Sequence, residues 1–106
     1  MLLTKETMEW FRRNYLGDDE SLRTAPEVSP LYAAAEGVCP AWVLTTSHDP
    51  LRDEGIAYVT KLRDAGVTAD HLNVEGIFHG FFGQTNVVPT LAKKALGAAA
   101  AAIKAV

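Results

Sequence analysis

The chain has 106 residues, of which 48% are hydrophobic and 22% charged, a composition typical of a folded segment and not of a disordered one. The net charge of −3, without a long run of either sign, excludes the basic surface expected of a nucleic-acid-binding protein. A single cysteine, Cys39, excludes an internal disulfide. We recognise no signal peptide and no run long enough to span a bilayer, so a cytoplasmic location is expected.

The first part of the chain predicts one helix and then a loop. Residues 4–16 have a suitable N-cap in Thr4, and Gly17 suits the position after the last helical residue. The apolar stripe at helical spacing consists of Met8, Phe11 and Tyr15. Residues 18–30 are polar and interrupted by prolines, which predicts a loop, and residues 30–38 are compatible with one or two helical turns.

Two later segments predict strands. Residues 41–47 start after Pro40 and contain the continuous apolar run WVL, as in a strand covered on both faces. Residues 67–75 place Leu72 and Val74 on one face of a second strand.

The segment between these strands predicts a helix over residues 50–65. Pro50 suits its first position, Gly66 suits the position after its end, and Asp49 before the proline is a favourable N-cap. The side chains expected to face inward are Ile56, Val59 and Leu62.

A strand, a helix and a strand in this order predict a βαβ unit, whose two strands are parallel with a right-handed crossover. A last helix is predicted over residues 88–104. One stripe of this helix consists of Val88, Leu91, Ala95, Ala99 and Ile103. The fold class is therefore α/β, within a single segment that has no internal repeat or linker. Because two parallel strands leave both sheet edges open, further strands are expected from elsewhere.

Two reactive side chains follow the predicted strands directly. Asp49 comes after the first strand in TTSHDPLRDEG, and His79 comes after the second in EGIFHGFF. Reactive groups of parallel sheets collect beyond the carboxyl ends of the strands, so these side chains are expected to meet. In such a pair the carboxylate fixes the imidazole tautomer and stabilises the imidazolium.

The stretches SPLYA, PAWVLTTSHDPLRDEG, LRDAGV and GIFHGFF, with the opening LLTKETMEWFRRNYLGD, resemble the C-terminal part of the hormone-sensitive-lipase-like branch of the α/β-hydrolase fold. This branch comprises esterases and lipases that act on small carboxylic esters through a serine, an acyl-enzyme and no cofactor. The resemblance covers nearly the whole chain. It implies a partial α/β-hydrolase fold in which Asp49 is the triad acid and His79 the general base.

The nucleophile of that family is missing from this sequence. The family carries its serine on a G-x-S-x-G turn ahead of the Asp and the His, and none of Ser21, Ser29 and Ser47 has the flanking glycines. The HGGG-type oxyanion loop is absent too. Cys39 precedes a strand, which excludes a cysteine version of the turn, and it is expected to be a small buried hydrophobe. The chain alone is therefore expected to be inactive.

Structural roles compete with the catalytic ones at several residues. Asp49 is explained by helix capping alone, and a loop histidine like His79 commonly bonds to backbone. The aromatic side chains around it are better explained by packing than by substrate binding. These weak substrate-binding candidates are Phe78, Phe81 and Phe82. No metal is expected, because the residues that suggest one lack ligand spacing. They are His48, Asp49, His71 and His79.

A second function class also fits the sequence. The chain is alternatively a non-catalytic α/β module that pairs through its open sheet edges, either with itself or with the missing N-terminal portion of a hydrolase. A G-x-S-x-G segment and an HGGG segment upstream of Met1 would favour the hydrolase. The sequence does not give the acyl or alcohol specificity.

Overall fold

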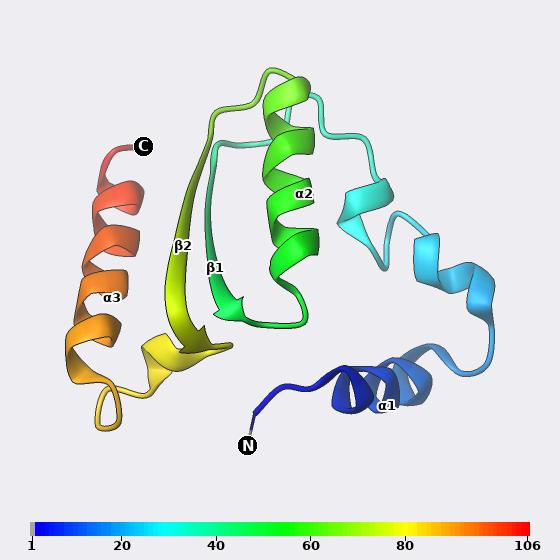
Figure 1. Cartoon of the computed structure of the whole chain (residues 1–106). Coiled ribbons are helices and arrows are strands. Elements are labelled where there is room, and N and C mark those ends of the chain that lie inside the picture. The colour runs from blue at the N-terminus through cyan, green and yellow to red at the C-terminus, as the bar shows by residue number, and fades with distance from the viewer. Residues whose placement is uncertain (1) are drawn as a thin grey trace.

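The computed structural model describes residues 2–106 and contains three helices and two strands (Figure 1). The helices are α1 (Lys5–Leu16), α2 (Arg52–Asp64) and α3 (Pro89–Lys104), and the strands are β1 (Ala41–His48) and β2 (Ala69–Phe78). Strands β1 and β2 are parallel and joined by α2, which confirms the expected α/β class. Within the described residues the sheet has only these two strands, so its outer edges are unpaired.

Helix α1 has the expected ends, but its apolar stripe is not buried. The Oγ1 of Thr4 accepts a hydrogen bond from the amide of Thr7 at 3.1 Å, and Gly17 closes the helix with φ +69°. Phe11 and Tyr15 are exposed, Tyr15 to 82%. The apolar stripe is therefore not covered by the sheet, since α1 lies away from it (Figure 1).

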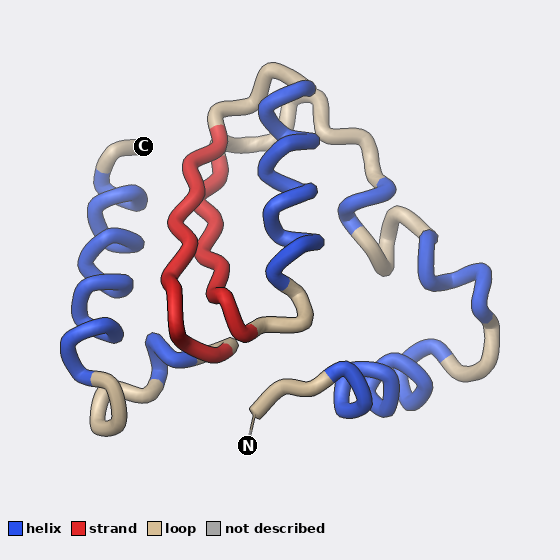
Figure 2. Tube along the Cα trace, in the orientation of Figure 1, coloured by secondary structure: helices blue, strands red, loops and turns tan. Residues whose placement is uncertain are grey.

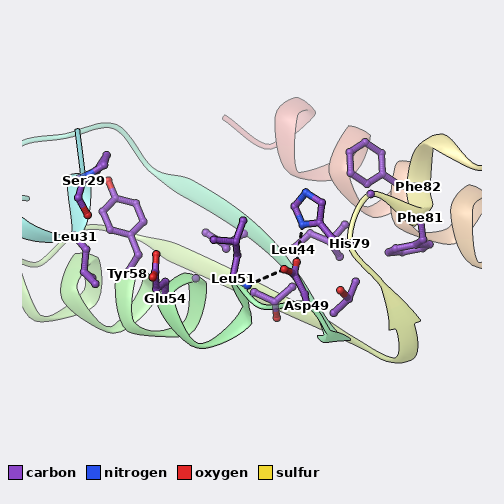
Figure 3. Close-up of a pocket in the computed structure, with 16 residues that line it drawn as sticks. Ser29, Leu31, Leu44, Asp49, Leu51, Glu54, Tyr58, His79, Phe81 and Phe82 are labelled. Carbon is purple, nitrogen blue, oxygen red and sulfur yellow. Dashed lines mark hydrogen bonds and ion pairs between the residues drawn. The ribbon is translucent and has the colours of Figure 1, made fainter. Parts of the chain in front are cut away.

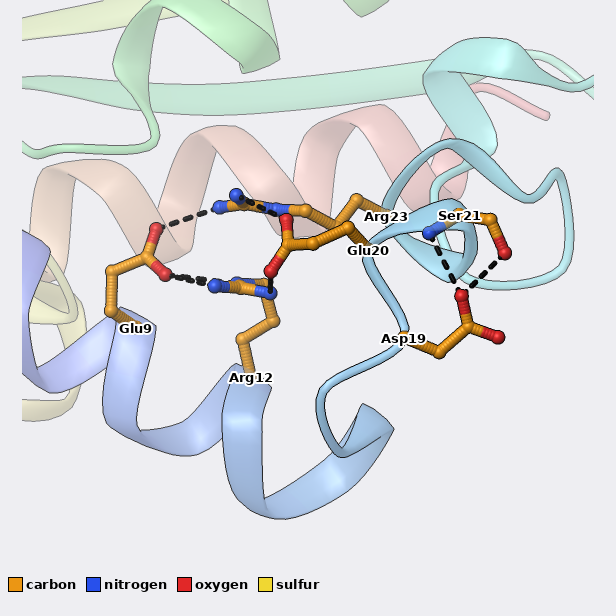
Figure 4. A network of polar contacts seen from close by, with 6 residues as sticks. All are labelled: Glu9, Arg12, Asp19, Glu20, Ser21 and Arg23. Atoms are coloured by element: carbon orange, nitrogen blue, oxygen red, sulfur yellow. Dashed lines mark hydrogen bonds and ion pairs between the residues drawn. The ribbon is translucent and has the colours of Figure 1, made fainter.

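The polar segment after α1 is more ordered than a loop. It contains the 3₁₀ helix Glu20–Thr24, which begins where Asp19 Oδ1 accepts hydrogen bonds from the amide and hydroxyl of Ser21. Figure 4 shows how ion pairs join this segment to α1. The paired side chains are Glu9, Arg12, Glu20 and Arg23. Local polar contacts stabilise this part of the chain. They could not be predicted from the sequence, because they leave no periodic pattern of apolar residues.

The helix between the strands starts two residues later than predicted. Pro50 and Leu51 form a turn ahead of α2, whose first residue is Arg52 and whose N-cap has no side-chain hydrogen bond. The reason is that Asp49 Oδ1 accepts from the amide of Leu51 at 2.8 Å, so the carboxylate caps this turn and not the helix. Ile56 is 39% exposed and was wrongly expected to face inward.

Strand β2 runs to Phe78, three residues beyond the predicted end. Its pairing with β1 shifts between Thr46 and His48, where β2 has a bulge. Figure 2 shows the two strands running side by side. Gly76 lies in the bulge with φ +73°, a conformation that costs a glycine little.

Two small apolar clusters hold the chain together. One, beneath α2, consists of Ala35, Val59, Leu62, Val67 and Ala69, and the other, toward α3, consists of Ile77, Phe81 and Ala95. Helix α3 begins at Pro89 and buries Ala92 and Ala95, whereas Leu91 and Ile103 of its apolar stripe are exposed. Among the described residues, α3 packs mainly on the turn at Phe81.

Candidate active site

The two side chains expected to meet do so at the carboxyl ends of the strands. Asp49 Oδ2 lies 2.7 Å from His79 Nδ1, which confirms that they are within hydrogen-bonding reach (Figure 3). The second oxygen, Oδ1, accepts from the amide of Leu51. The Asp49 side chain is only 8% exposed. With both oxygens bonded and little freedom to move, the carboxylate has a fixed orientation.

The imidazole of His79 is held at one nitrogen and open at the other. A carboxylate only accepts hydrogen bonds, so the contact with Asp49 puts a proton on Nδ1. No residue among 2–106 bonds to Nε2, and the side chain is 46% exposed. A neutral imidazole in this tautomer has its basic lone pair on Nε2, which is the arrangement of a general base.

The segment after His79 is anchored by one aromatic side chain. Gly80 turns the chain with φ +75°, and Phe81 behind it is 0% exposed within the second apolar cluster. Phe82 is 46% exposed and meets Phe81 edge to face, with the ring centroids 6.4 Å apart. Phe78 packs against the same cluster. Phe81 and Phe82 line the hollow beside the site, whereas Phe78 does not.

A hollow of about 370 Å³ extends from the Asp49–His79 pair along the outer edge of β1. Figure 3 shows Ser29, Leu31 and Tyr58 at the end opposite His79. Most of its wall is apolar, which suits an acyl chain. Because the hollow follows an unpaired strand edge, it is also the space that a further strand would occupy.

No hydroxyl or thiol of the described residues forms a hydrogen bond with His79. Ser47 Oγ accepts from the amide of Gly76 at 2.7 Å, and Ser21 is bonded to Asp19. Ser29 lies at the far end of the hollow. Cys39 is exposed, so the expectation that it is buried is wrong.

The other histidines have structural partners. His71 Nε2 lies 2.7 Å from Thr45 Oγ1 in the middle of the sheet, and His48 Nδ1 lies 3.2 Å from Ser47 Oγ. Within residues 2–106 no three His, Cys, Asp or Glu side chains are grouped as metal ligands. Among the same residues, every helix is too short or too polar to cross a membrane.

Sequence reasoning missed two contacts that shape the site. One is the amide of Leu51 on Asp49, and the other is the hydroxyl of Ser47 on the bulge at Gly76. Gly76 in NVEGIF lies just beyond the predicted end of the strand at residue 75, so the prediction held no glycine within a strand that would indicate a bulge. The partner of the bulge lies on the neighbouring strand, which the local sequence does not show.

Comparisons with known proteins find matches over most of this chain. A family model described as alpha/beta hydrolase fold matches residues 1–83. The chain is 41% identical over 81 residues to the carboxylic ester hydrolase LipN of Mycobacterium tuberculosis, covering 76% of this chain and 22% of LipN. It is 34% identical over 88 residues to an ethyl acetate hydrolase of Pseudomonas putida, covering 82% of this chain and 27% of that enzyme.

Solved structures give the same picture. An esterase from Pyrobaculum calidifontis superposes with a TM-score of 0.89 at 35% identity, over 97% of this chain and 33% of the esterase. The carboxylesterase EstE1, cloned from a metagenomic library, superposes with a TM-score of 0.88 at 39% identity, over 97% of this chain and 34% of EstE1. The chain thus spans between about a fifth and a third of the length of these relatives.

Proposed function

Because this chain belongs to the α/β-hydrolase-fold family, we propose that it forms the acid–base part of an enzyme that hydrolyses carboxylic esters. The observation that carries the proposal is the 2.7 Å contact between Asp49 and His79 at the carboxyl ends of two parallel strands. The names of the relatives, a carboxylic ester hydrolase and an ethyl acetate hydrolase, support small esters as the substrate class.

In the proposed reaction a serine from another segment supplies the nucleophile. Nε2 of His79 takes the proton from the serine hydroxyl as its oxygen attacks the ester carbonyl, and then gives the proton to the departing alcohol. Water repeats the sequence on the acyl-enzyme and releases the acid. Asp49 stays ionised throughout, holds Nδ1–H in place and stabilises the imidazolium. No cofactor takes part in these steps.

We further propose that this part pairs with an N-terminal portion carrying the serine turn and the oxyanion loop. The unpaired edge of β1 and the hollow along it support this pairing. So does the surface of 7422 Å², against about 5,800 Å² for a compact monomer of this mass. The radius of gyration of 15.3 Å also exceeds the value of about 13 Å typical of a domain of this length.

A second candidate function is a non-catalytic module that associates through the same edge. The observation in its favour is the set of large apolar side chains left exposed on α1 and α3, among them Trp10, Phe11 and Leu96. The two candidates differ in one respect: only the first requires His79 for turnover once a serine portion is present.

The test is a chimera in which residues 2–106 replace the matching third of the Pyrobaculum calidifontis esterase, which superposes with a TM-score of 0.89. The chimera should hydrolyse a short activated ester with a burst of alcohol release. His79→Ala and Asp49→Asn should each lower kcat by at least about 10³-fold, in line with losses of members of such triads.

His71→Gln is the matched control, since His71 bonds within the sheet and does not reach the site. Its effect on kcat should be small. A chimera that folds and turns over equally well after His79→Ala would exclude the proposed role. If His71→Gln abolishes turnover and His79→Ala does not, the general base is His71 and the proposed role of His79 is wrong.

A further inference from the structure

The register of the two strands explains how His79 comes to lie beside Asp49. Ala41 pairs with Ala69, 28 residues further along the chain, and this offset holds as far as Thr46 and Val74. His48 pairs with Phe78, 30 residues further along. The offset therefore grows by two residues within a single bulge of β2.

The two extra residues decide which side chain meets the carboxylate. The first offset, continued to the strand end, would set Asp49 opposite Ile77, a buried core residue. The second offset sets Asp49 opposite His79, 30 residues along, and the contact is present. A shift of two preserves which face each side chain occupies, so the bulge changes the partner of Asp49 without exposing the apolar face of β2.

One side chain of β1 holds this bulge. Ser47 is the residue that faces the three bulged residues 75–77, and its Oγ accepts from the amide of Gly76 at 2.7 Å. A bulged amide leaves the ladder and needs another acceptor. Ser47 provides it from β1, two residues ahead of Asp49.

We propose that Ser47 is a positioning residue for the Asp49–His79 pair. By accepting the Gly76 amide it holds the bulge that sets His79 opposite Asp49. The inference extends the proposed function, since it names a residue that serves the base of that reaction. Ser47 acts through the backbone of β2 and does not itself touch His79, because its hydroxyl is bonded to Gly76 and lies beside His48.

The first test compares Ser47→Ala with Ser47→Thr in the whole chain labelled with ¹⁵N. Ser47→Ala removes the acceptor, whereas threonine retains a hydroxyl on a side chain that suits a strand. The Gly76 amide should exchange with solvent about fivefold faster or more in Ser47→Ala, the ratio that one ordinary hydrogen bond supplies. Ser47→Thr should restore the slow exchange.

The second readout is the tautomer of His79, which a merely structural role would leave unchanged. In the parent chain the imidazole ¹⁵N shifts should report a proton on Nδ1. In Ser47→Ala the ¹⁵N shifts of His79 should move toward those of a free imidazole, which is a mixture of both tautomers. Asp49→Asn should have the same effect, whereas Ser47→Thr should keep the shifts of the parent chain. His71 should be unaltered in all variants, because its bond to Thr45 lies outside the bulge.

A second pair of variants covers the case in which Ser47→Ala does not fold. Gly76→Ala and Gly66→Ala introduce the same side chain at glycines with φ of +73° and +76°, both in open space. Only Gly76→Ala should disturb the His79 tautomer, because Gly66 ends α2 at the other end of the sheet.

An unchanged His79 tautomer in both Ser47→Ala and Gly76→Ala overturns the inference, as does a tautomer lost in Ser47→Ala and not restored by Ser47→Thr. These readouts need no turnover. If the chimera is inactive while the tautomer responds as expected, the ester-hydrolase proposal fails and the positioning role of Ser47 stands.

Discussion

The contact between α2 and β1 at Gly55 gives a quantitative prediction about packing. A Cβ added to Gly55 lies 2.9 Å from Cγ2 of Thr45, closer than ordinary van der Waals contact. Thr45 is 4% exposed, and its hydroxyl is fixed by His71 at 2.7 Å and Asn73 at 2.8 Å. Because these bonds stop Thr45 from rotating away, Gly55→Ala should force α2 from the sheet.

The magnitude follows from a comparison with Gly97, which lies within α3 and has nothing within 4 Å of an added Cβ. Both Gly→Ala changes gain about 0.5–1 kcal/mol of helix propensity. Only Gly55→Ala adds the overpacking cost of about 1–3 kcal/mol. Gly55→Ala should therefore be less stable than Gly97→Ala by about 1–3 kcal/mol.

Equilibrium urea unfolding followed by circular dichroism measures this difference. Thr45→Ser is the decisive background, since it keeps both hydrogen bonds and removes the methyl group that clashes. In that background the gap between the two variants should close to within about 0.5 kcal/mol, the level at which independent sites add. A gap that persists in Thr45→Ser, or a Gly55→Ala variant as stable as Gly97→Ala, would refute the reasoning.

Four other outcomes are expected. Phe81→Ala should cost about 3–5 kcal/mol in urea unfolding, against less than about 1.5 kcal/mol for its exposed neighbour in Phe82→Ala; similar costs would contradict the anchoring role of Phe81. The hydrogen bond from Arg12 holds the pKa of the Glu9 carboxyl below its usual value. The pairing therefore stabilises the folded chain at neutral pH, and this stabilisation is lost as the pH falls through the lowered pKa. Arg12→Gln should raise the Glu9 pKa in a ¹³C carboxyl titration. The chain alone should self-associate or unfold readily in sedimentation and thermal scans. It should also show no burst with an activated ester, and a burst would show that this chain contains a nucleophile of its own.

The βαβ unit could be predicted from the sequence because its signals are local. Pro40, the run WVL and Gly66 mark element ends that depend on a few neighbouring residues. The inward faces of α1 and α3 could not be predicted in the same way. An apolar stripe shows which side of a helix favours burial and not whether a partner covers it, and Tyr15 and Ile103 remain exposed.

The candidate site, too, could be predicted from the sequence only in part. Asp49 and His79 could be identified because each follows a strand, and their separation of 30 residues matches the register at the strand ends. The bulge that produces this register depends on a bond between Ser47 and Gly76, 29 residues apart. No periodicity within either strand records such a contact, so its partner had to come from the structure.

The contacts that fix the acid–base pair all lie within this chain. The amide of Leu51 orients Asp49, the hydroxyl of Ser47 holds the bulge ahead of His79, and Phe81 anchors the turn behind it. None of them involves the open edge of β1, where the proposed N-terminal portion would pair. It follows that the pair should be preorganised before a nucleophile arrives, so that pairing adds the serine and the oxyanion donors to a base already in place. The Nδ1–H tautomer of His79 should therefore be present in the isolated chain as well as in the chimera.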